Sequence, residues 1–407
     1  MSEDAGPVGV ADEALSGLVG EGAPPLGERP ALTTPTALQS HRQRLSESES
    51  LRRQPLAGLI GLCVVIPLAV LFTFGVNGAE GSIEVLGPIV TFALPAIAMI
   101  AFWWEDWPGS SLRPGWSALV DTALLVVLAI GLTLVGQALV AHVDLKGVFV
   151  PNADPAHPAT FPETLVLGST AFVAMLQITL VSERWPFTML GRFVSGLVGL
   201  AFVWGIAIAV QLLVVNFDTI QPAVMAASGV RNPGGPVTAI FLAAWLVCLG
   251  VWQTILFVAW RGSPFRGISS QPLRVLAGNV VTIGGGWLTY LAMREWAHWQ
   301  PAAIIAAGGC VIAAALLLSM LFDGWPTIRL QKDLGRLSTL AVIAVVAYGL
   351  NRGLAAIGNS IQFTKAHPDD FVTTASLAFI GTAIILHVAV WRRWPLPQGY
   401  RRSMPGR

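Results

Sequence analysis

The residues best suited to bind a solute are uncharged polar side chains inside long apolar segments. Asn279 and Thr282 are three residues apart, which places them on one face of a helix, and the glycine run 284–286 follows. Amide and hydroxyl groups donate and accept hydrogen bonds, so they could hold a small neutral compound. The predicted substrate path comprises Asn279, Thr282, Gly285, Gln137 and Gln253.

The glycine run has two interpretations. Three consecutive glycines weaken a helix and let another backbone approach closely. Close packing of two helices is the more common use of such a run. The alternative is a local break that opens a cavity beside Asn279 and Thr282.

Ionisable groups are scarce in the middle of the apolar segments. Asp121, Arg352 and His387 come nearest, and each is close to a segment end. A charge at the bilayer centre costs about 2.5–3.5 kcal/mol on the insertion scale, so charged residues kept there are usually functional. Their scarcity argues against an ion-coupled pump with a carboxylate relay and favours neutral cargo.

Histidines in the predicted outer loops offer a weak candidate metal site. Imidazole and carboxylate groups suit zinc, copper or iron, and these loops also carry acidic residues. No two of the histidines have the spacing of a known ligand pair, so we predict no metal and no cofactor. The weak candidates are His142, His157, His298 and His367.

Motifs of soluble catalysis are missing from the sequence. It contains no Walker A sequence, no dinucleotide-binding glycine fingerprint and no Gly-x-Ser-x-Gly elbow. His387 has no partner histidine for a membrane haem. We therefore predict no catalytic residues and do not expect an enzyme, although an intramembrane enzyme with its site on the outer loops is a third interpretation.

The composition explains where these residues must sit. Of 407 residues, 54% are hydrophobic and only 12% are charged, about half the charge of a soluble protein. Such a chain has too few charges for a soluble enzyme or a disordered regulator. The net charge of +1 gives no preference for nucleic acid, so the predicted partner is the lipid bilayer.

Ten apolar segments are long enough to cross a bilayer, which takes about 20 residues. Their runs are apolar on every face, which excludes a β-barrel. The predicted class is an all-α integral membrane protein, in which residues 55–395 form a ten-helix transmembrane domain between a disordered tail (1–54) and a short basic tail (396–407). The segments are Pro55–Phe74, Ile83–Trp104, Ala118–Val140, Glu163–Val181, Phe193–Val215, Val237–Trp260, Val275–Met293, Ala302–Phe322, Leu337–Ala356 and Val372–Trp391.

The distribution of Lys and Arg predicts the orientation. Most basic residues fall near the two ends of the chain and in the loops after even-numbered segments. Basic residues in short loops stay on the cytoplasmic side. We therefore predict that both termini are cytoplasmic and that the protein lies in a plasma membrane of bacterial type.

A Trp-Pro phrase recurs where even-numbered segments end. It reads Trp107-Pro108, Trp185-Pro186, Trp325-Pro326 and Trp394-Pro395, with a degenerate copy at Ser263-Pro264. Trp prefers the headgroup region and Pro stops a helix, so the phrase anchors a span. The pattern predicts five hairpins of one orientation, as in parallel repeats.

The position two before each Trp carries an ionisable residue. Three acids and two arginines at one depth could form an ion-paired belt that fixes hairpin order. The predicted belt comprises Glu105, Glu183, Arg261, Asp323 and Arg392.

Two functions fit these features. The first is a permease or channel-like carrier for a small neutral or hydrophobic compound. The second is a non-transporting scaffold or partner subunit of an enzyme complex, with other membrane subunits as partners. If Gln137, Gln253 and Asn279 face one cavity, transport is favoured; if they pair between packed helices, the scaffold is favoured.

Overall fold

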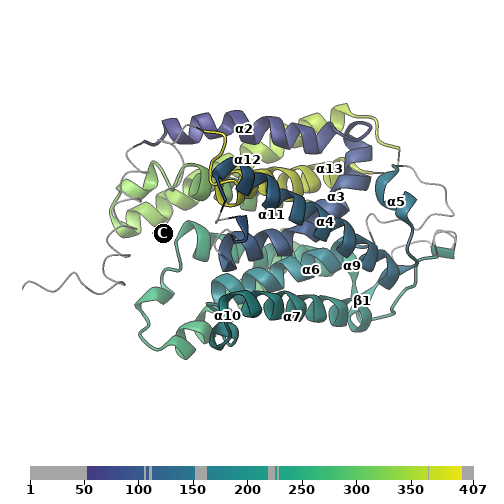
Figure 1. Cartoon of the computed structure of the whole chain (residues 1–407), viewed down its shortest axis with the longest axis horizontal. Coiled ribbons are helices and arrows are strands. Elements are labelled where there is room, and N and C mark those ends of the chain that lie inside the picture. Colours follow the sequence, from purple (N-terminus) through teal and green to yellow (C-terminus); the bar gives the residue numbers. More distant parts are fainter. Residues whose placement is uncertain are drawn as a thin grey trace, which may run out of the picture. The chain divides into compact units, whose positions relative to one another are not determined.

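The computed structural model describes residues 53–104, 107–109, 112–151, 163–218, 225–226, 229–364 and 366–396. Almost all of both predicted tails lies outside this part. The described chain is all-helical, apart from one parallel pair of two-residue strands, β1 (Val215–Asn216) and β2 (Val237–Thr238) (Figure 1). The all-α class is confirmed.

The helices follow the apolar segments of the sequence. The α-helices are α2 (Leu56–Phe74), α3 (Gly78–Ala98), α4 (Pro114–Val140), α5 (Leu145–Phe149), α6 (Leu165–Leu176), α7 (Arg192–Leu213), α9 (Ala239–Gln253), α10 (Gln271–Leu291), α11 (Pro301–Leu316), α12 (Lys332–Ser360), α13 (Pro368–Thr373) and α14 (Gly381–Ile385). The π-helical segments are η1 (Met99–Trp103), η3 (Gln177–Val181), η5 (Thr254–Ala259), η7 (Ala292–Trp296), η8 (Leu317–Leu321), η10 (Thr374–Ile380) and η11 (Leu386–Val390). The short 3-10 helices are η4 (Phe187–Met189), η6 (Phe265–Gly267) and η9 (Thr327–Arg329).

Nine helices in the described chain are long and apolar enough to cross a membrane, which indicates a multi-pass membrane protein. The predicted span at Glu163–Val181 is a shorter apolar helix, Leu165–Val181, formed by α6 and η3. The nine helices are Leu56–Phe74, Gly78–Trp103, Gly115–Val140, Arg192–Leu213, Ala239–Ala259, Gln271–Trp296, Pro301–Leu321, Asp333–Ser360 and Pro368–Val390.

Proline starts several of these helices. α4, α10, α11 and α13 each carry Pro in the first or second helical position. Proline has no N–H to satisfy and its fixed φ suits the first turn. These prolines therefore begin their helices without loss of a helical hydrogen bond.

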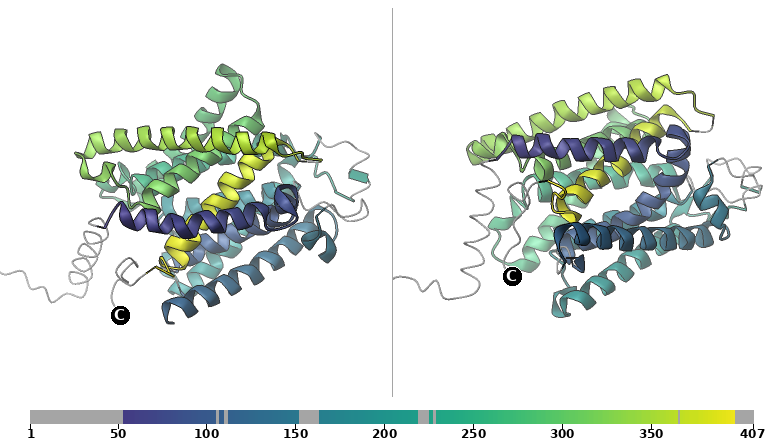
Figure 2. Two further views of the ribbon diagram at one scale, coloured as in Figure 1. Left: turned by 90° about the horizontal axis from the view of Figure 1, so that it is seen from above. Right: turned by 45° about the horizontal axis from the view of Figure 1, so that its top comes forward.

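The helices divide into central and peripheral ones. In the most apolar stretch of the span, 78% of residues are buried in Gly78–Trp103 and in Pro301–Leu321, and 83% in Pro368–Val390. In Asp333–Ser360, which is part of α12, only 11% are buried, and both views of Figure 2 show α12 in light green along the outside. The outer helices expose their apolar side chains, as expected where lipid replaces water.

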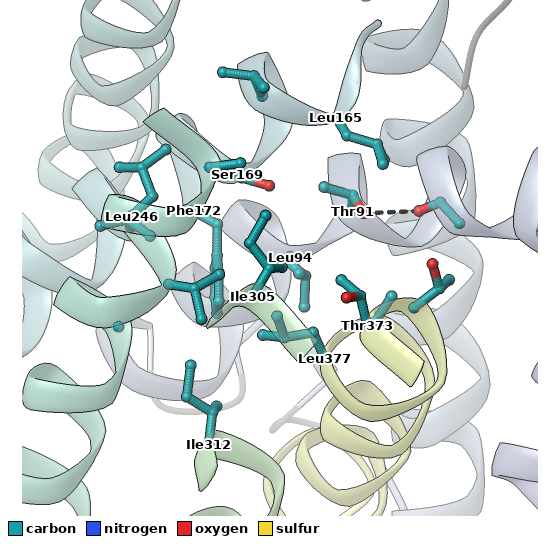
Figure 3. A pocket seen from close by; sticks show the side chains of 18 of the residues that line it. Thr91, Leu94, Leu165, Ser169, Phe172, Leu246, Ile305, Ile312, Thr373 and Leu377 are labelled. Atoms are coloured by element: carbon teal, nitrogen blue, oxygen red, sulfur yellow. Dashed lines mark hydrogen bonds between the residues drawn. The ribbon is translucent and has the colours of Figure 1, made fainter. Parts of the chain in front are cut away.

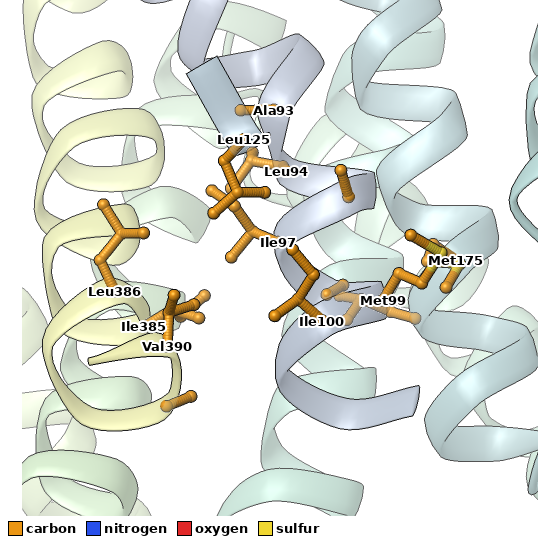
Figure 4. Packing of buried hydrophobic residues seen from close by; sticks show 14 of the residues in the cluster. Ala93, Leu94, Ile97, Met99, Ile100, Leu125, Met175, Ile385, Leu386 and Val390 are labelled. Atoms are coloured by element: carbon orange, nitrogen blue, oxygen red, sulfur yellow. The ribbon is translucent and has the colours of Figure 1, made fainter. Parts of the chain in front are cut away.

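The largest core cluster joins α3, α4, α6 and the C-terminal helices. Ile97 and Ile100 face Ile385 and Val390 in Figure 4, while Met175 of α6 packs on the other side of η1. All of these side chains are at least 96% buried. This packing fixes the helices that surround the central part of the bundle.

The five Trp-Pro turns share one local conformation. The N–H after each π-helical segment donates to a carbonyl five residues back, and the peptide before each of the five prolines is cis. Four residues of the predicted belt have left-handed φ angles of 52–53°. These four are Glu183, Arg261, Asp323 and Arg392. The fifth, Glu105, lies outside the described residues.

Hydrogen bonds place neighbouring Trp-Pro turns together. Nη1 of Arg184, in the second turn, donates at 3.2 Å to the carbonyl of Trp103, which ends η1 just before the first turn. Nη2 of Arg393, in the last turn, donates at 3.1 Å to the carbonyl of Met320, which is in η8 just before the fourth turn. We call the part of the bundle that carries these turns the turn end, and the opposite part the far end.

Candidate functional site

A cavity of about 440 Å³ lies inside the bundle, between α3, α6, α9, α11 and the segment from α13 to η10. Its wall follows α6 and η3 from Leu165 to Leu180, and α9 and η5 from Ala239 to Val258. At 1.5 Å per residue these stretches are about 22–29 Å long, so the cavity extends along most of the thickness of a bilayer. We call it the central cavity.

The wall of the central cavity is mostly apolar. Figure 3 shows Leu94, Phe172, Leu246 and Ile305 gathered around it, with the hydroxyl group of Ser169 among them. The hydroxyl of Thr91 also lies on the wall, but it donates to the Gly87 carbonyl of its own helix at 2.7 Å. A ligand for this space would therefore be largely hydrophobic.

Two carboxylates line the central cavity at its far end. Glu163 stands two residues before α6, and Asp370 is in α13. Asp370 caps its own helix, because its Oδ2 accepts the N–H of His367 at 2.9 Å. Glu163 has no comparable structural use among the described residues.

Glu163 is buried and incompletely satisfied. Its side chain is 6% exposed, and its Oε2 atom has no hydrogen-bond partner in the part of the chain that is described. Burial raises the pKa of Glu163 to about 7, because a carboxylate loses its hydration there. Near neutral pH this group can therefore be either a hydrogen-bond donor or an anion.

Sequence reasoning did not single out Glu163. The sequence places Glu163 at the boundary of the predicted span Glu163–Val181, and Asp370 in a predicted outer loop. One signal was available, because a lone acid directly before an apolar helix can be drawn into the bundle. Whether it is buried depends on the packing of distant helices, which a single sequence does not show.

Three residues of the predicted substrate path do come together. Nε2 of Gln177 donates to Oδ1 of Asn279 and to Oγ1 of Thr282, both at 2.9 Å. Nε2 of Gln253 donates to Oε1 of Gln177 at 2.5 Å. We call Gln177, Gln253, Asn279 and Thr282 the amide cluster; it joins η3, α9 and α10.

The amide cluster lies beside the central cavity. Nε2 of Gln253 also donates to the carbonyl of Val173, a residue of the cavity wall, at 3.1 Å. Gln253 and Thr282 are fully buried, and neither they nor Asn279 line the cavity. Gln137 is at the far end, where its Oε1 accepts the N–H of Asp144 at 3.0 Å.

The glycine run lies in an unbroken part of α10. A Cβ atom on Gly285 would be 2.6 Å from the Trp252 ring, and one on Gly286 would be 2.8 Å from Cα of Leu249. These two glycines therefore let α10 approach α9 closely. Gly284 has open space around its Cα.

Alanine at two of these glycines should have opposite effects. Gly286→Ala should lower the free energy of unfolding by about 1–3 kcal/mol, because its methyl group meets the α9 backbone, which cannot rotate away. Gly284→Ala should raise it by about 0.5–1 kcal/mol through helix propensity. Unfolding in mixed micelles measures both, and equal effects would contradict the close approach.

Two acids of the predicted belt, Glu183 and Asp323, form ion pairs at the turn end. Glu183 pairs with Arg274, whose Nε is 2.5 Å from Oε1. Asp323 pairs with Arg393, whose Nη2 is 2.8 Å from both carboxylate oxygens. Both arginines are outside the predicted set.

The two arginines of the predicted belt differ in their surroundings. Arg392 is 7% exposed. Arg261 is on the surface. Glu183 and Asp323 are therefore paired with arginines that the predicted belt did not include, Arg274 and Arg393.

Comparison of the chain with known protein families, with curated proteins and with solved structures finds no match. Function must therefore be argued from the central cavity and its surroundings. The cavity combines a long apolar wall with one buried, incompletely bonded carboxyl group.

The candidate metal ligands are dispersed. His142, His298 and His367 are exposed, and His157 lies outside the described residues. Within the described ranges, no three His, Cys, Asp or Glu side chains are grouped so that they could hold a metal ion.

Proposed function

We propose that the protein is a permease or channel-like carrier for a small, largely hydrophobic compound that occupies the central cavity. The observation that supports this is the length of the apolar wall, which follows α6 with η3 and α9 with η5 from the far end to near the turn end. The size of the cavity is within the range of about 300–1,000 Å³ typical of small-molecule sites.

For the membrane arrangement we propose five parallel hairpins with the turn end in the cytoplasm of a bacterial cell, and a tenth span formed by α6 and η3. The shared conformation of the Trp-Pro turns and the contacts between neighbouring turns support the repeat. The basic residues Arg184, Arg274 and Arg393 at this end support the orientation.

The amide cluster is proposed to act next to the cavity. Its members bind one another, so a solute would reach Asn279 or Thr282 only by exchanging one of these bonds for its own. Gln137 would act separately at the far end. Gly285 would serve by keeping α10 close to Trp252 of α9.

A second function, the scaffold or partner subunit, is favoured by the same cluster. Side chains that pair between close-packed helices are what a non-transporting bundle requires. This interpretation predicts that the central cavity has no specific ligand, and that the protein is purified with other membrane subunits.

Filling the cavity tests the carrier proposal. Ser169→Phe places a ring in the cavity from α6, whereas Val127→Phe places the same ring on the outward face of α4, where Val127 is 68% exposed. We expect Ser169→Phe to reduce binding of radiolabelled dodecanol to purified protein at least tenfold, and to reduce its protein-dependent uptake into liposomes. Val127→Phe should stay within twofold of the original protein. No difference between the two variants would contradict the proposal.

A further inference from the structure

We infer that the central cavity takes a cationic amphiphile, a lipophilic primary amine, whose ammonium group binds Glu163 and whose apolar part lies along α6 and α9. This inference rests on the proposed function of the cavity as a ligand site. It adds the chemistry by which the ligand is recognised.

One carboxylate oxygen of Glu163 lacks a hydrogen-bond partner among the described residues. A buried carboxylate is costly unless it is paired or fully hydrogen-bonded. Glu163 is 6% exposed, lines the cavity, and leaves Oε2 without a partner among the described residues. A ligand that enters the cavity can supply the missing donor.

The ionisable residues in the described wall of the cavity are all acidic. Glu163 and Asp370 are both acids, and no described basic residue lines the cavity. A carboxylate ligand would face two like charges there, which opposes its binding. An ammonium group gives both attraction and N–H donors, so it satisfies Oε2 better than a neutral hydroxyl does.

The two acids lie at one end of the cavity. Both are at the far end, and the wall then runs along α6 and η3 through Val166, Phe172 and Leu176 without another ionisable side chain. A ligand with one charged end and an apolar chain would place its charge at the acids and its chain along the apolar wall. The tail would occupy the space that Ser169→Phe fills.

Three probes that share a dodecyl chain separate the contributions of head and tail. Dodecylamine, dodecanol and dodecanoate are bound to purified protein at pH 8, where Glu163 is mostly ionised. We expect dodecylamine to bind at least tenfold more tightly than dodecanol, and dodecanoate to bind least. Glu163→Gln should weaken dodecylamine binding about tenfold and leave dodecanol within twofold.

Two further variants complete the design. Glu163→Asp retains the charge and should retain the preference for the amine. Glu295→Gln removes an exposed acid at the far end that does not line the central cavity, and should change none of the three affinities.

The outcomes distinguish the inference from the proposed function. If Glu163→Gln changes the affinities for amine and alcohol equally, or if dodecanoate binds as well as dodecylamine, the headgroup inference is overturned while the cavity remains a ligand site. If Ser169→Phe alters none of the three affinities, the cavity is not the site, and the proposed function fails with it.

Discussion

Replacing Arg393 with Gln should lower the free energy of unfolding by about 3–5 kcal/mol, the usual cost of removing one partner from a buried ion pair. Arg393 is 4% exposed, and its Nη2 donates to both oxygens of Asp323 at 2.8 Å. Without it, the Asp323 side chain, which is 19% exposed, loses its ion pair with Arg393. Unfolding of the purified protein in mixed micelles measures the loss.

Arg261→Gln is the matched control for this variant. Arg261 also has left-handed backbone in a Trp-Pro turn, with φ of 53° against 63° for Arg393, but it is exposed. Its replacement should cost less than about 0.5 kcal/mol. Adding Asp323→Asn to Arg393→Gln should restore part of the loss, since it removes the carboxylate that Arg393 no longer pairs. Equal losses for Arg393→Gln and Arg261→Gln would show that the ion pair is not what stabilises this end.

At pH 8, Glu163→Gln should raise the free energy of unfolding by about 3 kcal/mol, because each pH unit between the pKa of the unfolded chain, 4.5, and that of the folded protein, about 7, costs about 1.36 kcal/mol. The pKa of Glu163 rises from 4.5 to about 7 because the carboxyl group is buried. A raised carboxyl pKa means that the folded protein retains a proton that the unfolded chain has released. Stability is therefore lost as the pH rises from about 4.5 to about 7, and the loss is complete above that range.

The pH profile is the decisive measurement for this variant. Below pH 4.5 both forms carry a neutral side chain, so the gain from Glu163→Gln should vanish there. Exposed Glu295 provides the control, since Glu295→Gln should change the free energy of unfolding by less than about 0.5 kcal/mol. A gain of the same size at pH 4 and pH 8 would contradict the burial of a titrating carboxyl group.

Much of the fold could be predicted from hydropathy alone. The span predicted at Pro55–Phe74 is the helix Leu56–Phe74, and the span predicted at Ala118–Val140 ends at the same residue as α4. Such segments must satisfy their backbone groups internally, so their composition fixes their structure. The π-helical ends and left-handed turns were not predicted, because several residues with different side chains adopt the same φ there.

The candidate site was less predictable. Asn279 and Thr282 share a helix face, so their proximity follows from spacing, and Gln253 meets them through Gln177 only because α6, α9 and α10 pack together. Gln137 has the same chemistry but lies near the other end of its helix. The importance of Glu163 depends on its burial beside a cavity that α3, α9 and α13 also line, which no local pattern encodes.

Asp323 also bears on the order in which the protein is made. Its Oδ2 accepts a hydrogen bond from Gln54 at 2.7 Å and another from Arg393 at 2.8 Å. In the order of synthesis, Gln54 comes just before α2. Asp323 is made much later, and Arg393 follows η11, the last described helix. Because synthesis proceeds from the N-terminus, the hydrogen bond between Gln54 and Asp323 can form only after a further 269 residues have been made. The two hydrogen bonds of this carboxylate therefore join the first and the last part of the described chain, and both can form only late in translation.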